Sequence, residues 1–160
     1  MPETETDSDL GGTGPGSSTE PYAIDEVFVM VDEYDQTPLW EVRIGAPTLD
    51  AGDALAAAHR LNDVAPEGYQ FVEIPVEISY LGDGVGAPWF DFSVTGIDGQ
   101  SYEEAWIYEY PNPARDVTGL AAGETGSFVT LLLVKSDAIE GAVIKVSDWD
   151  TGVAYVALTP

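Results

Sequence analysis

The sequence predicts an all-β fold, an antiparallel β-sandwich of about eight strands with one short helical insertion. Apolar residues alternate with polar ones through most of the chain after residue 20, which is the pattern of strands with one buried face. Turn signals separate these runs, and only one segment has a helix-forming composition. The length of 160 residues fits a single domain.

The first 20 residues, MPETETDSDLGGTGPGSSTE, differ in composition from the rest of the chain. They hold five acidic residues and a Gly/Ser/Thr/Pro run but no aromatic residue, so they have little apolar surface to bury. We therefore predict a disordered acidic tether over residues 1–20. The folded β-sandwich domain is predicted over residues 21–160, where every Trp, Tyr and Phe lies.

The clearest strands lie over residues 40–44 (WEVRI), where apolar and charged residues alternate, and over residues 69–80. In the second run every other residue from Val72 to Tyr80 is apolar. Pro75 within it cannot donate a backbone hydrogen bond, which predicts a sheet edge or a β-bulge there. Further strands are predicted over residues 27–31, 90–97, 102–108, 127–134, 142–147 and 153–158.

One turn and one helix complete the prediction. Asp98 and Gly99 separate two predicted strands and both tolerate positive φ, which indicates a two-residue hairpin turn. Residues 51–62 (AGDALAAAHRLN) are rich in Ala and Leu, with Asp50 as the expected N-cap and Pro66 beyond the end.

The charge and composition exclude several classes of partner. The chain has 5 Lys and Arg against 29 Asp and Glu, a formal net charge of −24, so it lacks the cations that nucleic-acid binding requires. Anionic membrane surfaces are disfavoured for the same reason. No apolar run approaches the ~18 residues of a membrane-spanning helix, so we do not expect an integral membrane protein. The absence of Cys excludes disulfides and thiolate chemistry.

No motif predicts a catalytic centre. The lone His59 has no second His or Cys to complete a zinc site, and we interpret it as structural or solvent-facing. No GxSxG elbow is present. Residues 82–86 (GDGVG) lack the spacing and the Lys of a phosphate-binding loop and are interpreted as a loop between strands. We assign no catalytic residue and no cofactor.

Paired carboxylates leave an enzyme as an alternative. Glu103 with Glu104, or Asp148 with Asp150, would serve a carboxylate-based hydrolase of glycosides. Such pairs also arise by chance in a chain with 29 acids, so spacing alone is weak support.

Two acidic segments match part of what calcium requires. Residues 148–152 (DWDTG) begin like a calcium loop, but Gly comes one place early and no Glu follows at the twelfth position. Residues 32–35 (DEYD) form the second cluster. A solvated acidic surface is the favoured interpretation of both, with weak calcium binding as the alternative and no residue assigned as a metal ligand.

An aromatic row supplies the candidate binding residues. Trp106, Tyr108 and Tyr110 alternate with Ile107 and Glu109, so on a strand the three rings would share one face. Such a row could stack on sugar rings or anchor a protein partner. The competing interpretation, favoured by the large area of these rings, is that the row faces the core.

Several segments follow one another in an order that indicates a family. They are Glu20–Tyr22, Trp40–Ile44, Asn62 with residues 66–69 (PEGY), the VEIPVEISYLGDG run from Val72, residues 97–102 (IDGQSY), residues 119–133 and residues 153–158. In this order and spacing the sequence resembles a small immunoglobulin-like extracellular domain family of unknown function. The family is found in actinobacterial and archaeal lipoproteins and includes the mycobacterial immunoprotective secreted antigen.

The resemblance implies an immunoglobulin-like sandwich that is exported and often tethered by a lipidated Cys followed by a polar tail. It implies no catalytic residues. We therefore expect an extracellular or cell-surface binding domain, tethered through an N-terminal segment missing from this chain, with a protein or glycan partner at the cell envelope. Besides the hydrolase, a salt-adapted acidic spacer domain is an alternative, because screening by salt relieves repulsion among like charges.

Overall fold

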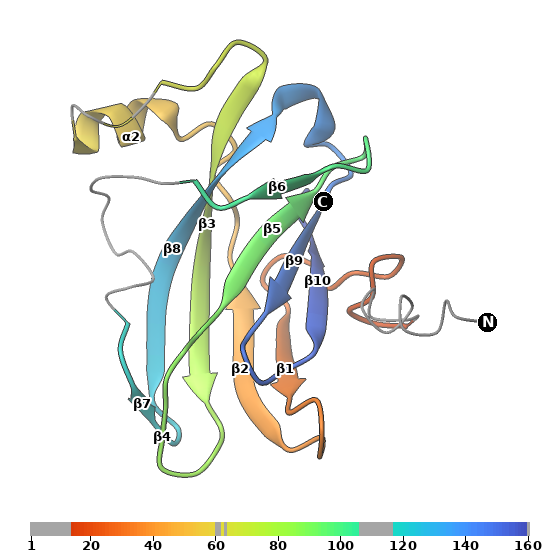
Figure 1. Ribbon diagram of the computed structural model, residues 1–160, viewed down its shortest axis with the longest axis vertical. Helices are drawn as coiled ribbons and strands as arrows, with labels where there is room; N and C mark the ends of the chain where they lie inside the picture. The colour runs from red at the N-terminus through yellow and green to blue at the C-terminus, as the bar shows by residue number, and fades with distance from the viewer. Residues whose placement is uncertain (1–13, 60–61, 63, 106–116, 160) are drawn as a thin grey trace.

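In the computed structural model, which describes residues 14–59, 62, 64–105 and 117–159, two antiparallel sheets pack face to face (Figure 1). One sheet has the strand order β1-β2-β3-β8 and the other β10-β9-β5-β6. The first sheet comprises β1 (Val27–Val31), β2 (Pro38–Ile44), β3 (Tyr69–Tyr80) and β8 (Thr125–Lys135). The second comprises β5 (Asp91–Thr95), β6 (Ser101–Glu103), β9 (Val143–Ser147) and β10 (Val153–Ala157). The predicted immunoglobulin-like β-sandwich is confirmed.

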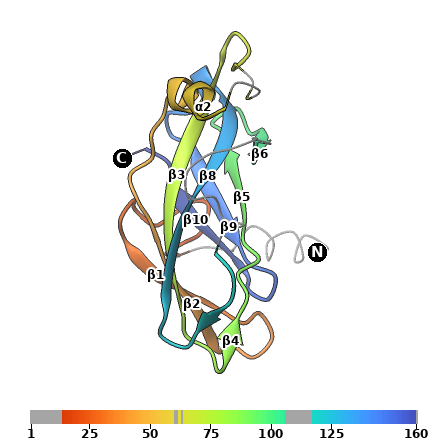
Figure 2. The same ribbon diagram turned by 90° about the vertical axis from the view of Figure 1, so that its left-hand side faces the viewer.

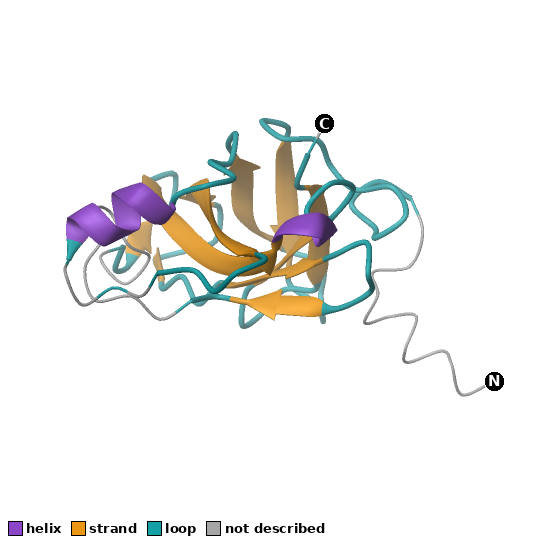
Figure 3. Cartoon of the chain, turned by 90° about the horizontal axis from the view of Figure 1, so that it is seen from above, coloured by secondary structure: helices purple, strands orange, loops and turns teal. Residues whose placement is uncertain are grey.

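Shorter elements close the two ends of the sandwich. The two-residue strands β4 (Val85–Gly86) and β7 (Leu120–Ala121) pair with each other at one end. The helix α2 (Gly52–Ala58) and the 3-10 turn η2 (Ser136–Ala138) lie at the other end (Figures 2 and 3).

The core lies between the inner faces of the two sheets, as the alternation of apolar and polar residues along the strands predicted. On β2, Trp40, Val42 and Ile44 are at most 2% exposed, and on β3 every second residue from Val72 to Ile78 is buried. At about 25 cal/mol per Å² of buried apolar area, such side chains are the main source of the folded state's stability. No helix of the described residues has the length and apolar character to cross a membrane.

The predicted edge or bulge at Pro75 is wrong. β3 lies between β2 and β8, and its register with β8 runs without a shift from Tyr69 to Ser79. The backbone N–H of Gly45 donates to the Pro75 carbonyl at 2.9 Å. Because the nitrogen and the carbonyl of one residue point to the same side of an antiparallel strand, the Pro75 nitrogen, which carries no hydrogen, also faces Gly45. β2 ends at Ile44, just before Gly45, and a central strand therefore accommodates proline where the ladder to its neighbour stops.

The helix is shorter than predicted, and its N-cap is Ala51 rather than Asp50. Leu55 anchors it, fully buried against Ala51, Phe71 and Leu131. The Asn62 side chain donates to the Leu55 carbonyl at 2.9 Å, which in a longer helix would accept from residue 59. This bond replaces the next helical turn.

The Asp98–Gly99 hairpin is present, but its turn differs from the predicted two-residue form. Only Gly99 has positive φ, at 80°, and the loop between β5 and β6 closes with a bond from Gly96 N–H to the Gln100 carbonyl. Asp98 instead accepts hydrogen bonds from the Gln100 N–H at 3.0 Å and the Tyr102 hydroxyl at 2.6 Å.

Residues 14–20, predicted as part of the tether, pack against β10. Tyr155 N–H donates to the Gly16 carbonyl at 2.9 Å, and Tyr22 N–H donates to the Tyr155 carbonyl at 2.9 Å. Ser17 is 1% exposed. The packed domain therefore begins before Pro21.

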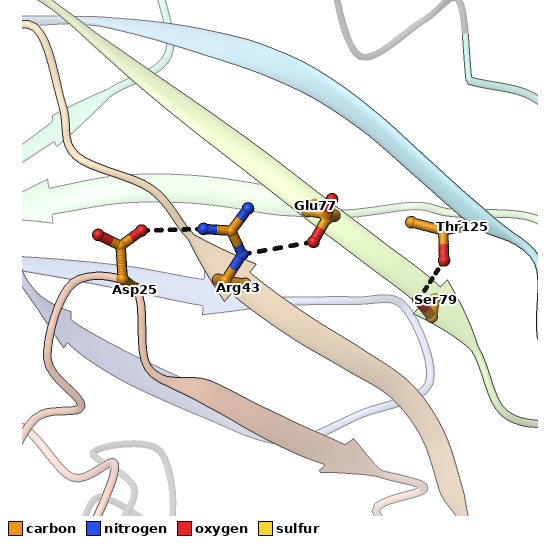
Figure 4. Close-up of polar contacts among 5 residues, drawn as sticks. All are labelled: Asp25, Arg43, Glu77, Ser79 and Thr125. Carbon is orange, nitrogen blue, oxygen red and sulfur yellow. Dashed lines mark hydrogen bonds and ion pairs between the residues drawn. The ribbon is translucent and has the colours of Figure 1, made fainter.

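The outer face of the first sheet carries a row of polar contacts (Figure 4) beside the exposed Val27 and Val29 of β1. Arg43 on β2 lies between Asp25 and Glu77, with N···O distances of 3.0 and 3.3 Å, and the hydroxyls of Ser79 and Thr125 are 2.7 Å apart. Exposed ion pairs of this kind contribute at most about 1 kcal/mol. Because of these ion pairs, Arg43, one of 5 Lys and Arg residues in the chain, already has acidic partners.

Candidate binding site

Four connections gather at the end of the sandwich that carries β4 and β7, which we call the loop end (lower end of Figure 1). They are residues 32–37, 81–91, 118–124 and 147–152. This end exposes several large apolar side chains. They are Tyr34, Leu81, Val85, Trp89 and Trp149.

An apolar cleft of about 570 Å³ opens at the loop end, and we call it the tryptophan cleft. Its lining comes from residues 87–91, residues 117–119, Phe128 and Trp149. Trp89 is 67% exposed and Trp149 78% exposed, and both line this one cleft. Large apolar side chains that are exposed together on a concave surface are typical of a contact site. A volume of this size is within the range of pockets that bind ligands.

Aromatic packing makes the cleft floor rigid. The Phe90 ring lies 5.4 Å from the Trp40 ring in an edge contact and 6.2 Å from Phe92. Phe92 in turn meets Phe128 edge-on at 5.9 Å. Because Trp40 and Phe92 belong to the main core, the residues beneath the cleft are fixed to both sheets.

Asp148 connects the two sides of the cleft. Its buried carboxylate accepts the Trp89 backbone N–H at 2.8 Å and the Trp40 indole N–H at 3.2 Å. The Asp148 backbone N–H donates to the Thr151 hydroxyl at 3.1 Å, which holds the β9–β10 loop that carries Trp149. Asp148 therefore connects the backbone at Trp89, and through its own N–H the loop that carries Trp149, to Trp40 in the core.

A second backbone contact joins the two acidic loops. Glu33 N–H donates to the Asp150 carbonyl at 3.0 Å, and Asp32 forms a bridge with Thr151. The Asp32 carboxylate accepts the N–H groups of Tyr34 and Asp35 at 2.8 and 3.2 Å, as in an Asx turn. The loop end is thus a continuous hydrogen-bonded surface.

The acidic residues of 148–152 and 32–35 were predicted to be solvated. This prediction is wrong for Asp148, which is buried and hydrogen-bonded. Asp35 is exposed, and hydrogen bonds from Thr37 lower the pKa of its carboxyl. Within the part of the chain that the structure describes, no three His, Cys, Asp or Glu side chains are placed to hold a metal ion. Weak calcium binding remains a prediction.

Residues 82–84 of the glycine-rich run form a loop, as predicted, whereas Val85 and Gly86 form the short strand β4 rather than a continuation of that loop. Gly84 has φ of 72°, and a Cβ at Gly86 would collide with the Tyr80 ring. The Tyr80 hydroxyl donates to the Asp83 carbonyl at 3.3 Å. Glycine is needed here because the loop crosses directly over an aromatic side chain.

Glu103 and Glu104 do not share hydrogen-bond partners. Glu103 accepts the Ser101 hydroxyl at 3.0 Å, whereas Glu104 accepts the Thr130 hydroxyl at 2.8 Å and the Phe92 N–H at 3.3 Å. Burial raises the pKa of Glu104, and these two hydrogen bonds oppose the rise. Glu104 therefore connects β6 to β5 and β8.

The structure tests the remaining sequence predictions unevenly. Trp106, Tyr108 and Tyr110, the predicted binding residues, lie outside the described residues. His59 is half-buried and follows α2 directly. Trp89 was not predicted from the sequence as a binding residue. A signal was present, because Trp89 follows Pro88 in a segment between strands, where the apolar alternation of a strand does not explain a large aromatic side chain.

Comparison with solved structures places the fold among known sandwiches. The chain is similar to the YjhA protein of Bacillus subtilis, with a TM-score of 0.57 and 11% identity over 86% of this chain and 98% of that one. It is similar to a secreted protein of Mycobacterium tuberculosis, MPT63, with a TM-score of 0.53 and 14% identity over 84% and 96%. A conserved hypothetical protein of Bacillus anthracis gives 0.52 and 11% over 84% and 94%.

No family model matches the sequence, and no curated protein is similar to it. At these identities the solved structures show the fold alone. The predicted relation to the mycobacterial secreted antigen is therefore confirmed for the fold, and membership of the lipoprotein family stays a prediction.

Proposed function

We propose that this chain is an exported, non-catalytic binding domain whose contact surface is the tryptophan cleft. The observation that carries the proposal is the exposure of Trp89 and Trp149, at 67% and 78%, on an apolar cleft of about 570 Å³. Tryptophan is enriched among the residues that dominate binding energies, and a partner that covers these rings gains the free energy of their burial.

The rigidity of the cleft supports the same proposal. Asp148 and the packing of Phe90 hold the surface in one arrangement before a partner arrives. A preorganised surface loses less conformational entropy on binding. The similar fold of a protein described as secreted agrees with export, and we extend the proposal to tethering at the cell envelope.

Binding to isolated envelope material tests the proposal. The wild-type domain, Trp89→Ala and Trp149→Ala would be compared at equal concentration, with bound partners identified by mass spectrometry. We expect each variant to retain its fold and to bind about tenfold more weakly. Tyr69→Ala, which removes a 38% exposed ring at the opposite end, is the matched control and should bind like the wild type. Equal binding by all four proteins would reject the cleft as the contact surface.

The non-catalytic part has its own test. A panel of chromogenic glycosides should show no turnover by the wild-type domain. Turnover that Glu104→Gln abolishes would replace the proposal with the hydrolase alternative, since the pKa of Glu104 is raised as an acid catalyst requires.

The charge supports a second, compatible property, adaptation to concentrated salt. Among 160 residues 29 are acidic and 5 are Lys or Arg, so repulsion opposes the compact state at low ionic strength. We expect the thermal midpoint to rise with NaCl through screening. Addition of Ca²⁺ at matched ionic strength separates this effect from the predicted calcium binding, since a bound ion raises the midpoint further.

A further inference from the structure

Among the described residues, the four segments of the loop end combine exposed aromatic faces with charge of a single sign. Each of its four segments carries acidic residues, and none contains Lys, Arg or His. The acids are Asp32, Glu33, Asp35, Asp83, Asp91, Glu124, Asp148 and Asp150. Of the three Lys and Arg side chains that the structure describes, Arg43 is paired on the outer sheet face and Lys135 lies at the opposite end of β8. The third, Lys145, lies on β9 and lines a separate pocket beside Asp91.

Three of these acids lie directly at the tryptophans. Asp91 lines the cleft, and Asp148 and Asp150 flank Trp149 in the sequence. The faces of tryptophan rings attract cations, and nearby carboxylates strengthen that attraction. The combination favours a ligand with both positive charge and apolar surface.

The same charges argue against other occupants. A second copy of this chain would bring the same acidic surface, and a phosphate-bearing ligand would be repelled. A neutral glycan could stack on the rings and donate hydroxyl hydrogen bonds to the carboxylates, but it would bring no positive charge to balance theirs. A single small cation would not reach Asp32, Asp35 and Glu124, which lie on segments beyond the cleft lining.

We infer that the tryptophan cleft binds a basic segment of a partner protein, with alternating Lys or Arg and aliphatic side chains. The inference rests on the proposed function and specifies its partner. The aliphatic groups enter the cleft over Phe90 and Phe128, and the cationic groups lie on the faces of Trp89 and Trp149. The outer acids attract the remaining positive charge and accelerate association.

Titration calorimetry with three synthetic amidated peptides tests this partner class. The peptides are GRLRLKG, its neutral counterpart GQLQLQG and its acidic counterpart GELELEG. We expect the basic peptide to bind at least about tenfold more tightly than the neutral one, with affinity that falls as NaCl rises from about 50 to about 500 mM. The acidic peptide should show no binding.

Variants separate the cleft from the general negative field. Trp89→Ala and Trp149→Ala should each raise the dissociation constant of GRLRLKG about tenfold, and Asp150→Asn about threefold. Tyr69→Ala and Glu67→Gln, at the opposite end, are matched controls and should change it less than about twofold. Equal effects in the two sets would mean unspecific attraction and would overturn the inference.

Other outcomes distinguish this inference from the proposed function. If GQLQLQG binds as tightly as GRLRLKG and both need Trp89, the cleft is a binding site but the basic partner is wrong. The same holds if a neutral hexasaccharide binds in a Trp89-dependent way and the peptides do not. If Trp89→Ala and Trp149→Ala instead lower the thermal midpoint by more than about 5 °C, the chain itself fills the cleft and both proposals fail.

Discussion

Each end of the sandwich contains an aspartate whose carboxylate accepts hydrogen bonds from a backbone N–H and from an aromatic side chain. The two networks differ in how far apart in the sequence the donors and the acceptor lie. At the loop end, the Asp148 carboxylate accepts from the nearby Asp150 N–H at 3.5 Å, and also from Trp40 and Trp89, which are 108 and 59 residues away in sequence. At the opposite end, the donors to Asp98 are Tyr102 and Gln100, only 4 and 2 residues away.

This difference in sequence separation explains why the two aspartates stabilise different kinds of surface. Asp148 is 7% exposed and joins three separate segments, so it can hold large exposed rings in place above the core. Asp98 is exposed and stabilises one turn of the chain. A local network fixes a hairpin, whereas a long-range network builds a surface from several loops.

The largest effect should follow removal of the long-range network. Asp148→Ala leaves the Trp40 indole N–H, on a side chain 2% exposed, and the Trp89 N–H without their acceptor. We expect a loss of about 3 kcal/mol in the free energy of unfolding, measured with urea, because buried donors lose a charged acceptor. Asp150→Ala, two residues away and exposed, is the control and should cost less than about 0.5 kcal/mol. Similar values for the two variants would deny Asp148 this role.

A smaller effect with a distinctive pH dependence is expected for Tyr102→Phe at the opposite end. The Tyr102 hydroxyl lowers the pKa of Asp98, and the same bond raises the pKa of Tyr102 to about 12. Because the pKa of Asp98 is lower in the folded than in the unfolded protein, Asp98 stabilises the fold at pH values above its unfolded-state pKa of about 4. This stabilisation is lost as the pH falls. The raised phenol pKa stabilises the fold below about pH 10, and this is lost between about pH 10 and 12.

The difference in unfolding free energy between wild type and Tyr102→Phe should therefore be constant from about pH 5 to 9 and shrink on both sides. Urea titrations at a series of pH values measure it. A difference that does not change with pH would mean that the hydroxyl contributes only through packing.

The smallest effect should come from Glu104→Gln. Burial raises the pKa of Glu104, so its contribution to stability is present below the unfolded value near pH ~4.3 and is lost as the pH rises through the folded value. The wild type should lose stability relative to the variant across that interval. A trend of the opposite sign would contradict the assignment to desolvation of the Glu104 carboxylate.

Most strand positions were predictable to within a few residues because the alternation from Val72 to Tyr80, and similar runs, records which side of each strand is buried. The strand predicted over residues 102–108 was not, because β6 ends at Glu103; residues 106–108 lie outside the described residues. The hairpin at Asp98 and Gly99 was predictable because its bonds lie within a few residues. The N-cap and length of α2 were not, since Asn62 ends the helix from outside it.

The sequence by itself determined the sandwich, the strand faces and the strong negative charge, all of which depend on neighbouring residues or on composition. Only the tertiary structure decided that Asp148 is a buried hydrogen-bond acceptor rather than a solvated surface acid, and that Trp89 and Trp149 share one cleft. The physical reason is that periodicity gives each residue a side of its own strand. The partner of a loop residue depends on which distant loops the strand order brings to the same end.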